Sequence, residues 1–214
     1  VLEESPSPII DTETRDNMGR TVVSALKKIG YTNSGTMEFL RDSSGELYFI
    51  EMNTRLQVEH PVTEMVTGVD LVKTQIKVAA GERLEVKEDH FPLRGHSIEC
   101  RICAEDPVTF APSPGKITAF HIPGGTGVRV DTAAYAECEI PPYYDSLIAK
   151  LIVQGRDREE AISRTARALD MFIVEGISTS IPLHQKIMAD PEFQAGHFDT
   201  NFLKKFNSMG VRET

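Results

Sequence analysis

The sequence predicts an α+β fold, and three observations lead to that expectation. Residues 11–30 have the apolar spacing of an amphipathic helix, and residues 35–53 have the pattern of a β-hairpin. The second half of the chain contains several short strand-like runs separated by proline and glycine. With 214 residues, the chain is long enough for one large domain or two small ones.

The first part of the chain predicts a linker, a helix, a hairpin and two short helices. Residues 5–8 (SPSP) cannot lie inside a helix, and Asp11 is a good N-cap for a helix that ends at Gly30. Strands follow over residues 35–40 and 46–53. Pro61 favours a helix start, so we expect one short helix to about Gly68 and a second that ends at Gly81.

The second part is expected to be rich in strands. A boundary is predicted within the charged residues 82–94, and Asp157 with Glu160 predicts the capped start of a helix. A short helix over residues 183–188 and a frayed tail complete the expected order. The predicted strands cover residues 97–104, 116–121, 127–131 and 146–154.

Composition excludes several classes of function. The net charge is −9, from 23 basic and 32 acidic residues, and this argues against binding to nucleic acids or anionic membranes. The longest apolar run, residues 147–153, is far shorter than the roughly 20 residues of a membrane span. Three cysteines are too few for a disulfide framework and favour the reducing cytoplasm.

The predicted hairpin carries the strongest chemical signal. If Ser44 and Gly45 form a two-residue loop, Glu38 lies directly opposite Glu51, whereas a three-residue loop moves the two out of opposition. Two carboxylates held so close repel each other unless a cation joins them. Asn53 on the same face adds an amide oxygen, and such oxygen ligands suit Mg²⁺ or Mn²⁺. The alternative is an exposed acidic face balanced by lysines of other elements.

Residues 54–60 carry a second signal. If this segment is extended, Arg55, Gln57 and Glu59 project to one side. Arginine binds a small planar oxyanion through two parallel hydrogen bonds, glutamine adds a donor, and glutamate can accept a proton as a general base. The alternative is an ordinary polar strand edge with an exposed Arg–Glu pair, worth under about 1 kcal/mol.

Five segments together resemble the biotin carboxylase family, and the resemblance extends over essentially the whole chain. They are residues 35–40 (GTMEFL), 48–64 (YFIEMNTRLQVEHPVTE), 99–107 (ECRICAEDP), 112–117 (PSPGKI) and 141–146 (PPYYDS). The resemblance implies an ATP-grasp ligase that uses ATP and bicarbonate to carboxylate biotin on a carrier protein. It also implies two domains. Residues 1–90 would be the C-terminal part of an ATP-grasp domain, a mostly antiparallel sheet with flanking helices, and residues 91–207 a strand-rich biotin carboxylase C-terminal domain.

The resemblance also assigns roles. The ligands of a Mg²⁺ or Mn²⁺ ion on ATP would be Glu38, Glu51 and Asn53. Bicarbonate would be bound by Arg55, Gln57 and the backbone N–H of Val58, and deprotonated by Glu59. Its attack on the γ-phosphate gives carboxyphosphate, which breaks down to CO₂ and phosphate. Arg101, with help from Arg55, would stabilise negative charge on the ureido oxygen of biotin; a pair of Arg101 with Glu99 is the alternative.

The implied partners are a biotin carboxyl carrier protein or domain, a carboxyltransferase and a second copy of the chain. Arg129 matches a basic position of the family's dimer region, but Thr126 stands where some members have an aromatic residue. The chain lacks an initiator Met and the family's N-terminal domain and mobile lid, so we expect a piece of a longer protein that is inactive alone. The alternatives are another ATP-grasp ligase of the carbamoyl-phosphate type and a non-catalytic docking or dimerisation module.

Two further motifs are interpreted as structural. Cys100 and Cys103 are three residues apart on a predicted strand, so they point to opposite faces and cannot share a zinc ion or a disulfide. Residues 124–127 (GGTG) lack the following lysine and helix of a phosphate-binding loop. They are expected to form a turn.

Overall fold

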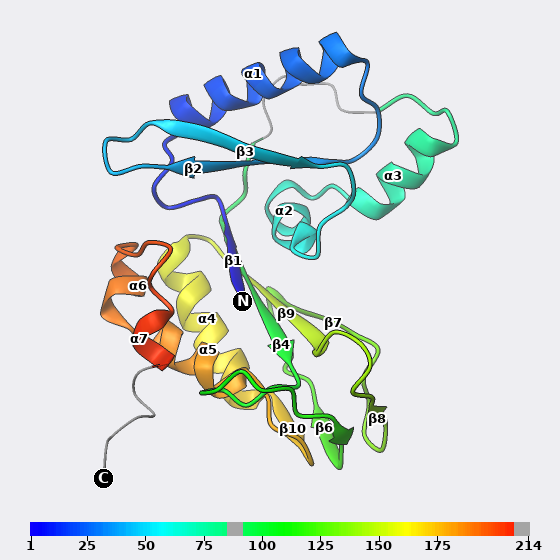
Figure 1. The fold of residues 1–214 in the computed structure, drawn as a ribbon, viewed down its shortest axis with the longest axis vertical. Coiled ribbons are helices and arrows are strands. Elements are labelled where there is room, and N and C mark those ends of the chain that lie inside the picture. The colour runs from blue at the N-terminus through cyan, green and yellow to red at the C-terminus, as the bar shows by residue number, and fades with distance from the viewer. Residues whose placement is uncertain (85–91, 208–214) are drawn as a thin grey trace. The chain divides into compact units, whose positions relative to one another are not determined.

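The computed structural model describes residues 1–84 and 92–207, and the chain divides into two compact units (Figure 1). The hairpin unit is Pro6–Arg94, and the sheet unit is Val1–Ser5 together with Gly95–Thr214. The first strand of the chain belongs to the sheet unit because it pairs with a strand of that unit. The predicted boundary within residues 82–94 includes residues 85–91, which lie outside the described residues.

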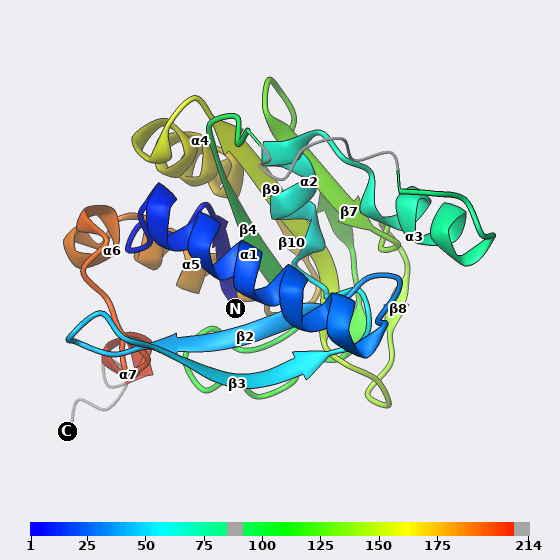
Figure 2. The ribbon, with the colours of Figure 1, turned by 90° about the horizontal axis from the view of Figure 1, so that it is seen from above.

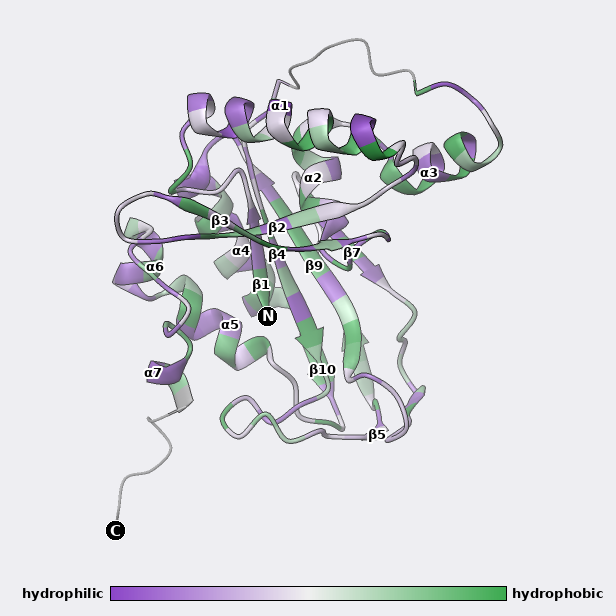
Figure 3. Cartoon of the chain, turned by 45° about the horizontal axis from the view of Figure 1, so that its top comes forward, coloured by the Kyte–Doolittle hydropathy of each residue, from purple (hydrophilic) through white to green (hydrophobic). Residues whose placement is uncertain are grey.

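The hairpin unit begins with α1, whose two ends follow the sequence prediction. The side chain of Asp11 accepts a hydrogen bond from the backbone N–H of Thr14 at 2.7 Å, and Gly30 ends the helix with φ at 67°. None of the 18 residues of α1 is buried, and hydrophilic and hydrophobic segments alternate along it (Figure 3). The described elements of this unit are α1 Thr12–Ile29, β2 Thr36–Arg41, β3 Leu47–Asn53, α2 His60–Thr67 and α3 Leu71–Ala79.

The loop of the β2–β3 hairpin has three residues, and the expectation of two was wrong. The backbone N–H of Asp42 donates to the carbonyl of Glu46 at 3.0 Å, and the N–H of Gly45 donates back to the carbonyl of Asp42 at 3.1 Å. Ser43, Ser44 and Gly45 therefore form the loop. Gly45 has φ at 95°, which only glycine adopts without strain, and a three-residue loop of this kind is a common hairpin closure.

A β-bulge restores the opposition that this longer loop would have removed. Phe39 pairs with Phe49, but the next pair is Glu38 with Glu51, so Ile50 is the extra residue in β3. The predicted opposition of Glu38 and Glu51 is confirmed, although by a different path from the one expected.

The helices α2 and α3 follow the predicted pattern. Pro61 lies in the first turn of α2, and Gly68 ends the helix in the left-handed conformation with φ at 73°. The side chain of Asp70 caps α3 by accepting a hydrogen bond from the N–H of Lys73 at 2.8 Å. The last residue of α3 is Ala79, two residues before the glycine expected to end it.

The sheet unit is built on a four-stranded antiparallel sheet with the strand order β1-β4-β9-β7. Two small two-stranded sheets, β10-β6 and β5-β8, extend it. The described strands are β1 Leu2–Ser5, β4 His96–Cys103, β5 Gly115–Lys116, β6 Ala119–His121, β7 Val128–Thr132, β8 Glu139–Ile140, β9 Leu147–Gly155 and β10 Ile173–Glu175. The described helices are α4 Arg158–Met171, α5 Ile181–Met188, α6 Pro191–Ala195 and α7 Lys204–Asn207.

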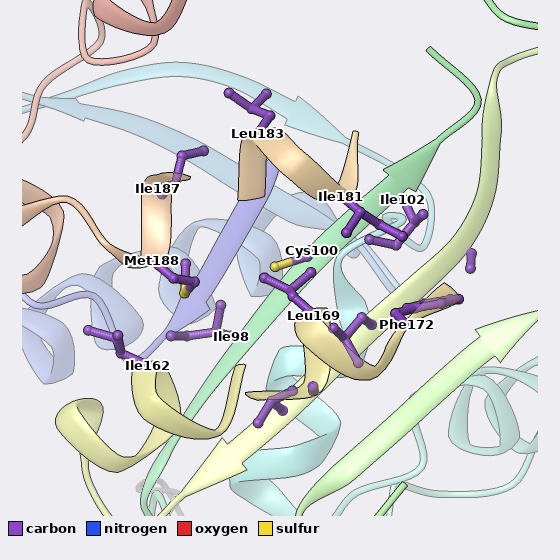
Figure 4. Close-up of a cluster of buried hydrophobic side chains, with 14 of the residues drawn as sticks. Ile98, Cys100, Ile102, Ile162, Leu169, Phe172, Ile181, Leu183, Ile187 and Met188 are labelled. Atoms are coloured by element: carbon purple, nitrogen blue, oxygen red, sulfur yellow. The ribbon is translucent and has the colours of Figure 1, made fainter. Parts of the chain in front are cut away.

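Helices α4 and α5 lie on one side of this sheet (Figures 1 and 2), and the core lies between them and β4. Asp157 caps α4 through the N–H of Glu160 at 2.9 Å, as predicted, and the Glu160 carboxylate accepts a hydrogen bond from the N–H of Arg156. Figure 4 shows the apolar side chains that meet there, and each of them is at most 8% exposed. They include Ile98, Cys100, Ile102, Ile162, Leu169, Phe172, Ile181, Leu183, Ile187 and Met188.

Two predictions at the ends of the chain were wrong. Ser5 lies in β1, so the segment that leads to α1 begins at Pro6 and not at Ser5. The chain up to Asn207 is folded and not a frayed tail. It contains α6, α7 and a cluster of phenylalanines with ring centroids as close as 5.4 Å. The cluster consists of Phe193, Phe198, Phe202 and Phe206. Residues 208–214 lie outside the described residues.

Candidate active site

The hairpin unit holds every predicted site residue except Arg101. Glu38 on β2 and Glu51 on β3 are cross-strand partners, and Asn53 follows two residues after Glu51. The side-chain amide of Asn53 donates to Glu38 Oε1 at 2.8 Å and to Glu51 Oε1 at 3.0 Å. One amide group therefore bridges two opposed carboxylates, which is the juxtaposition that the hairpin predicted.

Gln57 joins the two predicted groups of residues. Its side-chain amide donates to Glu38 Oε1 at 2.8 Å, so this oxygen accepts hydrogen bonds from both Asn53 and Gln57. The sequence assigned Gln57 to the bound anion alone. The structure connects it directly to the carboxylate pair as well.

The donor chemistry of this group fits a hard divalent cation. Carboxylate and amide oxygens are preferred ligands of Mg²⁺ and Mn²⁺. Rotating the Asn53 carboxamide by half a turn replaces its N–H donors with its oxygen, which would then face the same two carboxylates. Among the described residues there is no group of three or more His, Cys, Asp or Glu side chains placed to hold a metal. Glu38, Glu51 and Asn53 are two carboxylates and one amide, so they do not form such a group.

The segment after β3 is extended only at its start, which corrects the prediction for residues 54–60. The carbonyl of Gln57 accepts hydrogen bonds from the N–H of His60 at 3.3 Å and from its ring Nδ1 at 2.7 Å. This closes a turn that contains Val58 and Glu59, so Glu59 does not continue the alternation of Arg55 and Gln57.

The turn places Glu59 at the N-cap position of α2. Its side chain makes no capping hydrogen bond, so the carboxylate is not used to stabilise the helix end. Arg55 is exposed, and its Nη1 donates to the carbonyl of Leu56 at 3.2 Å. The predicted anion-binding residues thus lie in one short segment between the carboxylate pair and a helix start.

Arg101 lies on β4 of the sheet unit. Its Nη2 approaches Glu3 Oε1 on β1 at 3.4 Å, and both side chains are about one-third exposed. On one face of β4, the side chains of Ile98, Cys100 and Ile102 enter the core. Ser97 and Glu99 on the other face are fully buried as well.

Sequence reasoning missed two buried polar residues behind Arg101, which are Ser180 and His184 at the start of α5. Both donate to the carbonyl oxygen of Arg101, each at 2.9 Å. The only signal in the sequence is a histidine on the apolar face of a short helix. Such a residue has no visible partner until the chain is folded.

The two structural motifs behave as expected. All three cysteines are free thiols, and Cys100 is buried in the core while Cys103 is half-buried. Burial and the charge of Glu99 raise the pKa of the Cys100 thiol far above its usual range. Residues 124–127 form a turn that leads into β7, with Gly127 at φ 75°.

Two family models match the chain in succession. Residues 1–87 match the ATP-binding domain of the carbamoyl-phosphate synthase L chain, and residues 99–205 match the biotin carboxylase C-terminal domain. The biotin carboxylase of Nostoc sp. is 55% identical over 208 residues, which are 97% of this chain and 46% of that protein. A pyruvate carboxylase subunit from Methanothermobacter thermautotrophicus is 55% identical over 96% of this chain and 42% of its own length.

Solved structures agree with these matches. The biotin carboxylase domain dimer of Hydrogenobacter thermophilus 2-oxoglutarate carboxylase, in complex with MgADP, ADP and bicarbonate, has a TM-score of 0.95 and 50% identity. It covers 100% of this chain, which in turn covers 48% of it. Biotin carboxylase from Campylobacter jejuni, in complex with an ATP ligand, has a TM-score of 0.92 and 48% identity over 96% of this chain and 46% of that structure.

Fold and matches together first define a class of protein, in which ATP-binding sequence of the ATP-grasp type precedes a biotin carboxylase C-terminal domain. The second family model spans half of the chain, and the chain belongs to the biotin carboxylase family. The chain spans about half the length of the curated relatives that it matches. In the described residues, no helix is both long and apolar enough to cross a lipid bilayer.

Proposed function

We propose that the chain supplies part of the active site for the ATP- and bicarbonate-dependent carboxylation of biotin on a carrier protein. One observation supports this most strongly. The opposed carboxylates Glu38 and Glu51, bridged by Asn53, are continuous through Gln57 with the short segment that holds Arg55 and Glu59. The residues proposed to hold the cation and those proposed to hold the oxyanion are therefore adjacent within one unit.

In this proposal, Glu38, Glu51 and Asn53 hold the Mg²⁺ or Mn²⁺ ion of the nucleotide. When bound, such an ion neutralises charge on the phosphate oxygens. Gln57 donates to the ligand Glu38, so it keeps the anion-binding segment in register with the cation site.

Bicarbonate binds to Arg55, Gln57 and the backbone N–H of Val58, and Glu59 takes its proton. Glu59 suits this role because a carboxylate can accept a proton and the residue directly follows Val58 in the anion-binding segment. A bicarbonate oxygen then forms a bond to the γ-phosphorus of ATP while the bond to the bridging oxygen breaks and ADP leaves. The product is carboxyphosphate, which separates into CO₂ and phosphate.

The second half-reaction takes place on biotin. Phosphate accepts the ureido proton, the ureido nitrogen forms a bond to CO₂, and the ureido oxygen carries negative charge meanwhile. Arg101, with help from Arg55, supplies fixed positive charge for that oxygen. The Arg101 side chain is about one-third exposed, and its Nη2 lies 3.4 Å from Glu3 Oε1.

The further partners are proposals drawn from the relatives. These are subunits or domains of larger carboxylases, and one is solved as a dimer. We propose that this chain likewise works with a biotin carboxyl carrier protein or domain and a carboxyltransferase, and as a homodimer. The free thiols of all three cysteines are compatible with a reducing cytoplasm.

A ligase of the carbamoyl-phosphate type is the second candidate, because residues 1–87 match that ATP-binding domain. The biotin carboxylase model over residues 99–205 favours the first candidate. Dependence of ADP release on biotin distinguishes the two reactions.

The experiment measures ADP release with ATP, Mg²⁺, bicarbonate and free biotin. It compares three samples. They are this chain alone, this chain mixed with a polypeptide that supplies the N-terminal half of a full-length family member, and the full-length polypeptide. We expect activity only where both halves are present. Glu59→Gln should lower the rate about 10²- to 10⁴-fold, the usual contribution of a general base.

Glu46→Gln is the matched control, because Glu46 is an exposed carboxylate of the same unit and lies in the β2–β3 hairpin. It should keep the rate of the unmodified protein. Glu59-dependent activity from the chain alone would contradict the proposal of a divided site. Full activity of the Glu59→Gln variant would contradict the assignment of the base.

A further inference from the structure

The carbonyl oxygen of Arg101 accepts two side-chain hydrogen bonds from the start of α5. Ser180 Oγ donates to it at 2.9 Å, and His184 Nε2 lies at 2.9 Å from it. A carbonyl in a sheet normally accepts a backbone N–H from a neighbouring strand. At Arg101, two side chains from the start of a helix donate to the carbonyl.

Two features of β4 lie next to this contact. Towards β1, the ladder continues to the end of the strand, and the N–H of Arg101 donates to the carbonyl of Val1 at 3.0 Å. Towards β9, the register shifts between Ile102 and Cys103, so the ladder on that side is irregular close to Arg101.

Ser180 compensates for the register shift between Ile102 and Cys103. Its N–H donates to the carbonyl of Cys103 at 3.0 Å, and its Oγ accepts a hydrogen bond from the N–H of Cys103 at 2.9 Å. The same Oγ donates to Arg101. One serine thus fixes the backbone on both sides of Ile102.

His184 fixes the same backbone from inside the core. Its side chain is fully buried, and burial lowers its pKa from 6.5 to about 4, so the imidazole is neutral near pH 7. A neutral imidazole carries one proton. Because Nε2 faces a carbonyl oxygen, that proton must lie on Nε2, and Nδ1 has no hydrogen-bond partner among the described residues.

We propose that His184 and Ser180 are positioning residues for Arg101, holding the segment of β4 from which its guanidinium projects. This inference rests on the proposed role of Arg101 at the ureido oxygen of biotin. Neither residue touches a reactant. Both act through the backbone, and a displacement of about 1 Å in a charged catalytic group can lower a rate by roughly 100-fold.

The test uses the full-length polypeptide that carries this sequence. His184→Leu removes the donor and keeps an apolar side chain of similar volume, whereas His184→Gln restores an N–H near the position of Nε2. Ile187→Ala is the matched control: Ile187 is equally buried one turn further along α5, and its truncation costs stability without touching Arg101. Ser180→Ala is a second, independent variant.

Two rates are measured for each variant. The first is ADP release with ATP and bicarbonate alone, and the second is the same rate with biotin added. His184→Leu and Ser180→Ala should lower the ratio of the second rate to the first about tenfold. His184→Gln should recover most of that loss, and Ile187→Ala should leave the ratio unchanged.

Three outcomes would overturn the inference: an unchanged ratio in both His184→Leu and Ser180→Ala, a fall in Ile187→Ala that equals theirs, or no recovery in His184→Gln. The Arg101→Ala variant distinguishes a failure of the positioning role of His184 and Ser180 from a failure of the proposed function. If Arg101→Ala leaves biotin carboxylation intact, the role of Arg101 itself is wrong. If Arg101→Ala abolishes carboxylation while His184→Leu and Ser180→Ala do not change it, only the positioning role is wrong.

Discussion

The carboxylate pair of the hairpin unit shows how single residues define a site. Glu38 and Glu51 are held opposite each other by strand pairing, so their repulsion cannot be relieved by moving apart. In this structure, the amide of Asn53 donates to both. A divalent cation between these three residues would offset the same repulsion with two positive charges.

This geometry predicts a specific metal dependence. In the full-length polypeptide, Glu51→Gln should raise the Mn²⁺ concentration that gives half-maximal ADP release about 10- to 100-fold, because one anionic ligand is lost. Titration of activity with Mn²⁺ at saturating ATP measures this. Glu46→Gln, which removes an exposed carboxylate of the same hairpin, serves as the control. An equal shift in both variants would argue against metal binding at Glu51.

At the scale of elements, a buried charged cluster fastens β1 to the rest of the sheet unit. Glu4 Oε2 on β1 lies 2.7 Å from His96 Nε2 on β4 and 2.8 Å from Arg158 Nε on α4. Arg158 also donates to the carbonyls of Phe193 and Gln194 at the end of α6. Strand β1 is therefore held by side chains in addition to its backbone pairing.

The cluster predicts a loss of stability in acid. Burial raises the pKa of the Glu4 carboxyl. The hydrogen bonds from His96 and Arg158 and the charge of Arg158 together lower it by more, so the pKa falls below its usual 4.5. A carboxyl with a depressed pKa stabilises the folded state above about pH 4.5. That contribution is lost as the pH falls below 4.5 and through the pKa of the folded state.

Glu4→Gln tests this at two pH values. At pH 7 it should lower the free energy of unfolding by roughly 3 kcal/mol, since it leaves a buried arginine without its partner. The difference from the unmodified protein should shrink as the pH falls below about 4.5. Chemical denaturation measures both. Glu3→Gln, at a partly exposed ion pair on the same strand, should cost under about 1 kcal/mol; an equal loss would refute a special role for Glu4.

At the scale of the whole molecule, burial is divided unequally between the two units. Among the buried hydrophobic residues of the described chain, only Val62 and Val66 belong to the hairpin unit. The hairpin carries exposed apolar side chains, among them Tyr48, Phe49 and Ile50. Since burial of apolar surface drives folding, most of the folding free energy of this chain lies in the sheet unit.

Two helices allow a matched test of this difference by hydrogen exchange. Helix α1 has 18 residues and none is buried, whereas α4 has 14 residues and packs a buried face against the sheet. In the isolated chain, amides of α1 should exchange about 100-fold faster than those of α4. Equal protection of the two helices, measured by mass spectrometry of their peptides, would show that the two units unfold together.

Local signals allowed much of the fold to be predicted. The caps at Asp11 and Asp157, the glycine end of α1 and the apolar face of β4 all depend on residues that are near in sequence. For this reason the hairpin and the elements β4, β7, β9, α4 and α5 were expected at nearly their observed positions. The strand predicted over residues 116–121 is divided into β5 and β6, and β1, β8, β10, α6 and α7 were not predicted. The family resemblance added the chemical roles expected of individual residues in the hairpin unit.

The sequence by itself thus determined the longer helices and strands, the family and the candidate residues of the hairpin unit. Only the tertiary structure decided the bulge at Ile50, the pairing of β1 with β4, and the hydrogen bonds of His184 and Ser180 to Arg101. The reason is physical. Caps and periodicity act over a few residues, whereas these contacts join residues that are distant in sequence, and they form only where packing brings otherwise unsatisfied polar groups together.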